Sequence, residues 1–215
     1  MQKVYLLVIS FCLFLTACED PSANKTKATT AEPKTAANTT AGKPAGTGTS
    51  LPISPENSKI EFTGSKVTGS HEGGFKKFSG TIDLVGEKPE SSSVNVDIET
   101  ASIYANVDQL TQHLKTPDFF DVEKFPKATF TSTKIEPNTS GGADSYNVTG
   151  DFDLHGVKKS ITFPATIKVN PDDVEVKSEF SINRKDFGVS YAGKADDLIR
   201  DGVVIKLDLK APKKK

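Results

Sequence analysis

Several residue types are scarce in this sequence of 215 residues. It has no tryptophan, one methionine and two cysteines, and both cysteines, Cys12 and Cys18, lie near its beginning. A disulfide framework and thiol-based catalysis are therefore excluded from the rest of the chain. An excess of charge of one sign is also lacking, because 27 basic and 28 acidic residues leave a net charge of −1. Nucleic acid is not an expected partner, since no bulk positive charge attracts it.

Long hydrophobic runs are missing too. The most apolar segment extends from Val4 to Leu15 and is interrupted by Ser10. A helix that crosses a bilayer needs about 20 residues, so this shorter run, with Lys3 before it, is typical of the core of a signal peptide. The following residues, Leu15-Thr16-Ala17-Cys18, resemble the bacterial lipobox.

At a lipobox the cysteine is diacylated and the chain is cut just before it. We therefore expect residues 1–17 to be a lipoprotein signal peptide and Cys18 to carry lipid, since several acyl chains give a stable membrane anchor. This predicts a protein of the bacterial cell envelope that faces the periplasm, attached to either the inner or the outer membrane. The alternative is an ordinary secreted protein with a chance cysteine at its cleavage site.

The residues after the lipobox predict a flexible tether over residues 18–50. From Glu19 to Ser50 there is no aromatic residue and no aliphatic residue larger than alanine. Such a segment cannot bury enough surface to offset the entropy lost on ordering. Random-coil scaling gives it a reach of roughly 30 Å. The folded domain is expected to cover residues 51–215.

The remaining sequence alternates between apolar and polar residues, which predicts half-buried β-strands. Eight such runs cover residues 59–62, 78–84, 94–98, 128–132, 146–154, 161–169, 174–182 and 203–209. Residues typical of turns lie between them, at His71–Gly74, Pro137–Gly142, His155-Gly156 and Asn170–Asp173. The tight His155-Gly156 link predicts a hairpin.

One segment has helical spacing instead. Val107, Leu110 and Leu114 fall on one helical face, so we expect a short helix over Asn106–Lys115 that begins at Asn106 as N-cap and ends before Pro117. Eight strands and this insert predict an all-β fold, an eight-stranded antiparallel barrel with one short helix. Composition alone leaves a β-sandwich open as the alternative.

Six ordered sequence blocks resemble the YceI family. They are Ser58–Phe62, Gly74–Gly80, His113–Asp121, Phe125–Phe130, Gly150–Lys159 and Ile182–Val189. Members of that family are lipocalin-like barrels that bind polyisoprenoid or related amphiphilic lipids. The resemblance covers Ile53 to Ala211 and implies the same fold and class of ligand here. The lipobox and the tether replace the plain signal peptide that many relatives carry.

The sequence has 13 phenylalanines, which suit a dry interior. In an eight-stranded barrel the core and a ligand pocket share one volume, so inward-facing aromatic side chains are also candidate ligand contacts. The candidate ligand-binding residues are Phe62, Phe78, Leu110, Leu114, Phe119, Phe120, Phe130, Phe152, Phe180, Phe187 and Arg184.

Specific positions are expected for three of these candidates. Phe119 and Phe120 follow the helix, and because two exposed phenylalanines are costly, at least one is expected to face inward at a barrel mouth. Arg184 is expected to form an ion pair with the loop of Asp118 and Asp121, or else to reach a ligand headgroup.

The motifs of common enzymes are not found. There is no nucleophile elbow and no glycine-rich phosphate loop, and the three histidines lie in two turns and at a helix end, which does not predict a metal site. We therefore expect a binding protein without catalytic residues or cofactor, whose partners are a long-chain lipid and the membrane. The alternative is a structural or adaptor lipoprotein with a side-chain-filled barrel, acting on protein partners that the sequence does not identify.

Overall fold

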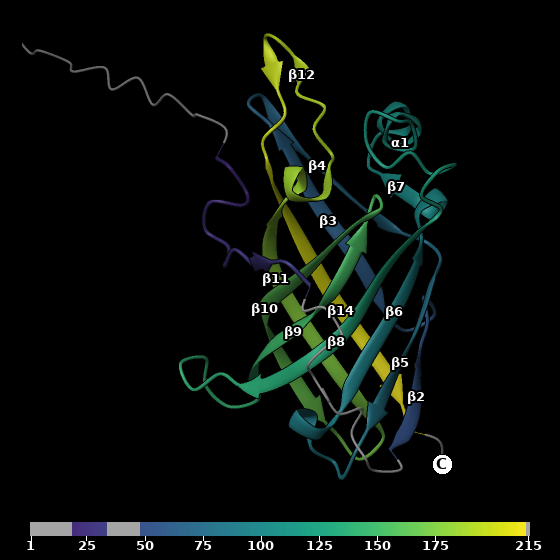
Figure 1. Ribbon diagram of the computed structural model, residues 1–215, viewed down its shortest axis with the longest axis vertical. Coiled ribbons are helices and arrows are strands. Elements are labelled where there is room, and N and C mark those ends of the chain that lie inside the picture. The colour runs from purple at the N-terminus through teal and green to yellow at the C-terminus, as the bar shows by residue number, and fades with distance from the viewer. Residues whose placement is uncertain (1–18, 34–47, 214–215) are drawn as a thin grey trace, which may run out of the picture.

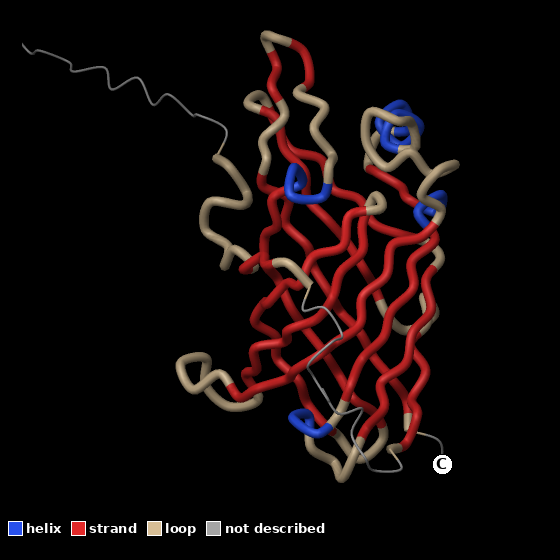
Figure 2. The backbone as a smooth tube through the Cα atoms, viewed as in Figure 1, coloured by secondary structure: helices blue, strands red, loops and turns tan. Residues whose placement is uncertain are grey.

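The computed structural model describes residues 19–33 and 48–213, and the structural statements below concern those residues. The predicted signal peptide, the predicted lipidation site Cys18 and residues 34–47 of the predicted tether lie outside them. Antiparallel strands curl into a barrel, and the helical turns lie near its two ends (Figures 1 and 2). None of the described helices is both long and apolar enough to cross a bilayer.

The strands of the described ranges are β1 (Thr29–Ala31), β2 (Thr49–Ile53), β3 (Lys59–Lys66), β4 (Gly69–Phe75), β5 (Phe78–Leu84), β6 (Ser93–Glu99), β7 (Ile103–Ala105), β8 (Lys127–Pro137), β9 (Ser145–Leu154), β10 (Val157–Val169), β11 (Asp173–Asn183), β12 (Gly193–Lys194), β13 (Asp197–Leu198) and β14 (Gly202–Pro212). The helical elements are α1 (Asp108–Leu114) and three 3₁₀ turns, η1 (Pro89–Ser91), η2 (Thr100–Ser102) and η3 (Arg184–Phe187). The eight predicted strands correspond to β3, β5, β6, β8, β9, β10, β11 and β14.

The strands follow one another around the barrel in the order β2-β5-β6-β8-β9-β10-β11-β14-β3-β4-β7. The chain passes from β4 directly into β5, so this corner brings the two ends of the curled sheet together. Strands alternate because one face packs inward: in β10, Ile161, Phe163, Ala165 and Ile167 are buried and the residues between them are not. The predicted all-β barrel with one short helix is confirmed, although the strands are more numerous than the eight predicted, and most of those eight are longer than predicted.

The hairpin between β9 and β10 is also as predicted. His155 and Gly156 both have positive φ angles, 54° and 73°. Such a two-residue turn matches the right-handed twist of the flanking strands. The turn at Asn170–Asp173 likewise joins β10 to β11, where the Asn170 amide donates to the Asp173 carboxylate over 2.8 Å.

Two local predictions were wrong. The helix begins at Asp108 rather than Asn106, because the Asn106 side chain lies 3.0 Å from the His71 ring nitrogen instead of capping the helix. Residues 71–74 belong to β4 and are not a turn. Gly73 is needed there for close packing, since a Cβ atom on it would lie 2.5 Å from the Phe62 ring.

The prediction of a flexible tether is wrong for residues 19–33. β1 pairs with β10, with Thr29 opposite Thr162. Ala28 is buried, and its backbone N–H donates to the Ser181 carbonyl over 2.8 Å. The segment is stabilised mainly by backbone hydrogen bonds, which do not require apolar side chains. The domain boundary also moves, because β2 begins at Thr49.

This segment fills a seam in the barrel wall. The backbone ladder between β10 and β11 is confined to the part near their shared turn, from the Thr166–Lys177 pair to the Val169–Val174 pair, and the Ser178 hydroxyl donates to the Pro164 carbonyl just beyond it. Beyond that point the strands separate, and residues 26–31 lie between them (Figure 1). We refer to residues 26–31 as the seam segment.

Candidate ligand cavity

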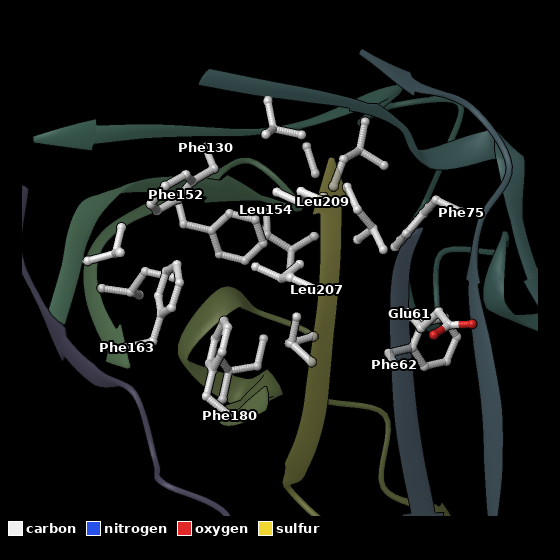
Figure 3. Close-up of a pocket in the computed structure, with 18 of the residues that line it drawn as sticks. Glu61, Phe62, Phe75, Phe130, Phe152, Leu154, Phe163, Phe180, Leu207 and Leu209 are labelled. Carbon is white, nitrogen blue, oxygen red and sulfur yellow. The ribbon is translucent and has the colours of Figure 1, made fainter. Parts of the chain in front are cut away.

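The barrel encloses a cavity of about 230 Å³ with a wall that is almost entirely hydrocarbon. The cavity extends along the barrel, from Leu84 and Pro89 at the end near η1 to Phe119 and Phe120 beside α1. Between these ends, aromatic and aliphatic side chains of β8 to β11 and of β14 point toward one another (Figure 3). Such a wall attracts a hydrocarbon chain because burial removes apolar surface from water.

Several inward-facing side chains are only half-buried, because they face the unfilled lumen. Val203, Ile205 and Leu207 of β14 line the cavity and are each partly exposed. The Phe130 ring lies over Gly150, whose missing side chain leaves room for it: a Cβ atom there would be 2.4 Å from the ring. The lumen is therefore not filled by side chains, which contradicts the predicted filled barrel of the adaptor alternative.

Most of the candidate ligand-binding residues lie on the cavity wall. Those on it are Phe62, Leu114, Phe119, Phe120, Phe130, Phe152, Phe180 and Arg184. The structure places Phe78, Leu110 and Phe187 elsewhere, which corrects the prediction for these three. Phe187 is fully buried behind the wall, where its ring contacts Phe152 at 5.2 Å between centroids.

Phe78 and Leu110 also lie away from the cavity wall. Phe78 is buried at the start of β5, away from the lumen. Leu110 packs against a second, smaller cluster formed by Ile103, Leu114, Phe119 and Val189. Helical spacing placed Leu110 on the same face as Leu114, but only Leu114 reaches the cavity.

The mouth beside α1 is narrowed by aromatic rings. Phe119 is buried, and its ring contacts His113 at 5.0 Å and Tyr191 at 5.4 Å. Phe120 contacts Phe75 edge to face, with 5.9 Å between centroids. Both residues of the pair face inward, so the predicted inward orientation is confirmed. These rings narrow the lumen at this end, where Phe120 remains partly exposed.

Arg184 has a structural position on the wall. Its guanidinium donates to the carbonyl oxygens of Val189 at 2.7 Å, Arg200 at 3.1 Å and Ile199 at 3.3 Å. Its acidic neighbour is Asp201, at 3.5 Å, and not the predicted loop of Asp118 and Asp121. Burial lowers the pKa of the Arg184 guanidinium, and Asp201 opposes that shift. Arg184 thus ties η3 to the segment that leads into β14.

Two of the charged residues on the wall, Arg184 and Arg200, lie at this same end, whereas Glu61 lies opposite Lys206 near the middle of β14. Glu61, Arg184 and Arg200 are the charged residues that line the cavity among those described. Sequence reasoning missed Phe75, Arg200 and the three β14 residues as wall residues. The alternation of β14 indicated which of its residues face inward, whereas nothing in the sequence marked the loop residue Arg200.

Fold and cavity together define a hollow antiparallel barrel with an apolar lumen. A model of the YceI-like domain matches residues 52–211. The chain belongs to this YceI-like family.

Relatives and solved structures agree with this assignment. A UPF0312 protein of Pseudomonas putida strain W619 is 37% identical over 127 residues, which are 56% of this chain and 65% of that protein, so the match spans just under two thirds of the relative. The crystal structure of Burkholderia cenocepacia BcnA has a TM-score of 0.67 and 29% identity, covering 74% of this chain and 99% of BcnA. A polyisoprenoid binding domain from Saccharophagus degradans, with a TM-score of 0.60, 18% identity and coverage of 76% and 99%, has the same fold.

Proposed function

We propose that this protein is a cell-envelope lipoprotein that holds a polyisoprenoid, or a comparable long-chain amphiphile, inside its barrel. The observation that carries the proposal is the unfilled, hydrocarbon-lined lumen. The lipobox at Cys18 supports membrane attachment, and the Saccharophagus degradans domain of the same fold is described as polyisoprenoid-binding. The hydrocarbon chain lies along the lumen, and the polar headgroup lies toward Arg200 at the mouth.

Binding in this arrangement is driven by apolar burial. Each square ångström of apolar surface removed from water contributes about 25 cal/mol before the entropic costs of association are counted. The wall offers few polar groups, so it selects for chain length and width more than for a headgroup pattern. No catalytic role is proposed for the charged residues of the wall, and Arg184 already donates to three carbonyl groups.

Native mass spectrometry of the protein purified from its own envelope tests the proposal. We expect an added mass on Cys18 that matches diacylglyceryl modification and a second, non-covalent lipid mass. Titration with a fluorescent long-chain probe then compares the wild type with Ile205→Phe and Leu207→Phe, which fill the lumen, and with Leu207→Met, which conserves its volume. Probe binding that is unchanged by lumen filling, together with no bound lipid, favours the surface-acting adaptor instead.

A further inference from the structure

The large hydrophobic side chains that remain exposed gather at one end of the barrel. Among the described residues they are Val67, Val107 and Leu198, with exposed fractions of 47%, 42% and 48%. Val67 lies in the turn between β3 and β4, and its backbone N–H donates to the Leu198 carbonyl over 3.1 Å. Val107 follows β7, which runs beside β4 toward the same turn. Single exposed residues are ordinary, but their concentration at one end is not.

The N-terminal part of the described chain is fixed at this same end. The Asp20 carboxylate lies 3.7 Å from the Arg200 guanidinium, and Ser22 packs against Gly202 at the start of β14. Ser22 also donates to Asp20, through its backbone N–H at 2.9 Å and its hydroxyl at 2.7 Å. The seam segment then holds the chain in the wall. Consecutive Cα atoms are about 3.8 Å apart, so a lipid on position 18 is attached within about 8 Å of Asp20.

The opposite end of the barrel has a different character. Its turns carry Glu87, Lys88, Asp144 and Asp172, all of which are exposed. It lies roughly 30 Å away along the barrel axis, given the 11 residues of tilted strand β14. The molecule is therefore polar at one end, and at the other it combines exposed apolar tips with the nearest approach to the lipid anchor.

We propose that the end bearing Val67 and Leu198 rests on the surface of the bilayer, as a second contact beside the lipid anchor. This inference rests on the proposed lipidation of Cys18, and it specifies the orientation that lipidation alone does not. The docked segment replaces a free tether with a link of two residues. The mouth near Phe120 and Arg200 then faces the membrane, so a lipid passes between bilayer and lumen over a short path, without the barrel leaving the surface.

Depth-dependent quenching tests this orientation. The sequence has no cysteine beyond Cys18, so a fluorophore on Thr68→Cys or on Ala143→Cys reports one site at each end. The full-length protein is expressed with its signal peptide, purified from membranes and reconstituted into vesicles of phosphatidylethanolamine and phosphatidylglycerol. Nitroxide lipids labelled at the headgroup should quench the Thr68 site severalfold more than the Ala143 site. Equal quenching at the two sites, or stronger quenching at Ala143, overturns the proposal.

Two further variants separate the contributions to this orientation. A flexible insertion between Cys18 and Glu19 should reduce the difference in quenching, because it restores a long tether, and Val67→Ser with Leu198→Ser should reduce it further. Glu87→Ser with Lys88→Ser, at the polar end, is the matched control and should leave it unchanged. Flotation of the vesicles measures attachment separately. Protein that does not float overturns membrane attachment and this inference together, whereas protein that floats with equal quenching overturns only the orientation.

Discussion

The rings of Phe163 and Phe180 stack face to face across the seam between β10 and β11, with centroids 4.2 Å apart and planes 9° from parallel. The two strands are not hydrogen-bonded to each other at these positions. Ring stacking therefore joins the wall on its lumen side, while the seam segment joins it through backbone hydrogen bonds. The wall remains continuous where the sheet itself is interrupted.

The stacked pair should show measurable energetic coupling. Phe163→Ala and Phe180→Ala are each expected to lower the free energy of unfolding by about 3–5 kcal/mol. The double variant should lose less than the sum by about 0.5–1.5 kcal/mol, because each ring stabilises the other. Urea denaturation measures all three. Phe163→Ala combined with Phe119→Ala, which lies in the second cluster, is the control pair and should be additive. Strict additivity of the stacked pair would contradict the coupling.

The seam segment should contribute to stability, in contrast to a free tether. Ala28 is only 3% exposed, so Ala28→Glu buries a carboxylate without a partner and should lower the melting temperature by several degrees. Thr29 is its exposed neighbour, and Thr29→Glu should leave the melting temperature nearly unchanged. Thermal unfolding by circular dichroism compares them. If the two variants melt alike, the segment does not pack on the barrel in solution.

These results show which features follow from side-chain pattern. The alternation of Ile161, Phe163, Ala165 and Ile167 predicted β10 because burial on one face imposes a period of two. The seam segment escaped prediction, since it is held by backbone groups that every sequence has. β4 escaped because Gly73 lies in a strand to make room for the Phe62 ring, and a glycine pair ordinarily indicates a turn.

For the cavity, the sequence predicted which side chains face the interior better than it predicted which of them line the lumen. Phe152 and Phe187 have the same chemistry and their rings touch, yet only Phe152 lines the lumen. The difference depends on η3, which turns Phe187 behind the wall. Such a placement arises from tertiary packing that no local period encodes.

The mouth residue Phe120 should matter more for ligand capture than for folding. It is half-buried and lines the cavity, so Phe120→Ala is expected to weaken binding of a long-chain probe severalfold with a modest loss of stability. Phe187→Ala is the matched control, because Phe187 is fully buried and off the wall. It should lose about 3–5 kcal/mol of stability while binding the probe nearly normally. Probe titrations alongside urea melts give both quantities, and the reverse ranking would contradict a role for Phe120 at the entrance.

Arg184 should be a residue of stability rather than of ligand recognition. Arg184→Met removes a buried guanidinium and leaves three carbonyl groups without their donor, so a loss of at least about 2 kcal/mol is expected. Lys185→Met changes the exposed neighbour and should cost little. Urea denaturation compares the two. A stable Arg184→Met protein that has lost affinity for anionic long-chain probes would instead assign Arg184 to headgroup binding.

The seam segment also sets an order of assembly. Thr29 pairs with Thr162, more than 130 residues later in the sequence, so the binding site of the seam segment forms only when β10 and β11 are complete. Contacts between such distant parts of a chain form late, because closing a long loop costs entropy before the contact compensates for it. Insertion of the seam segment is thus expected to be a final step of folding. An inserted seam segment therefore indicates that β10 and β11 have already formed.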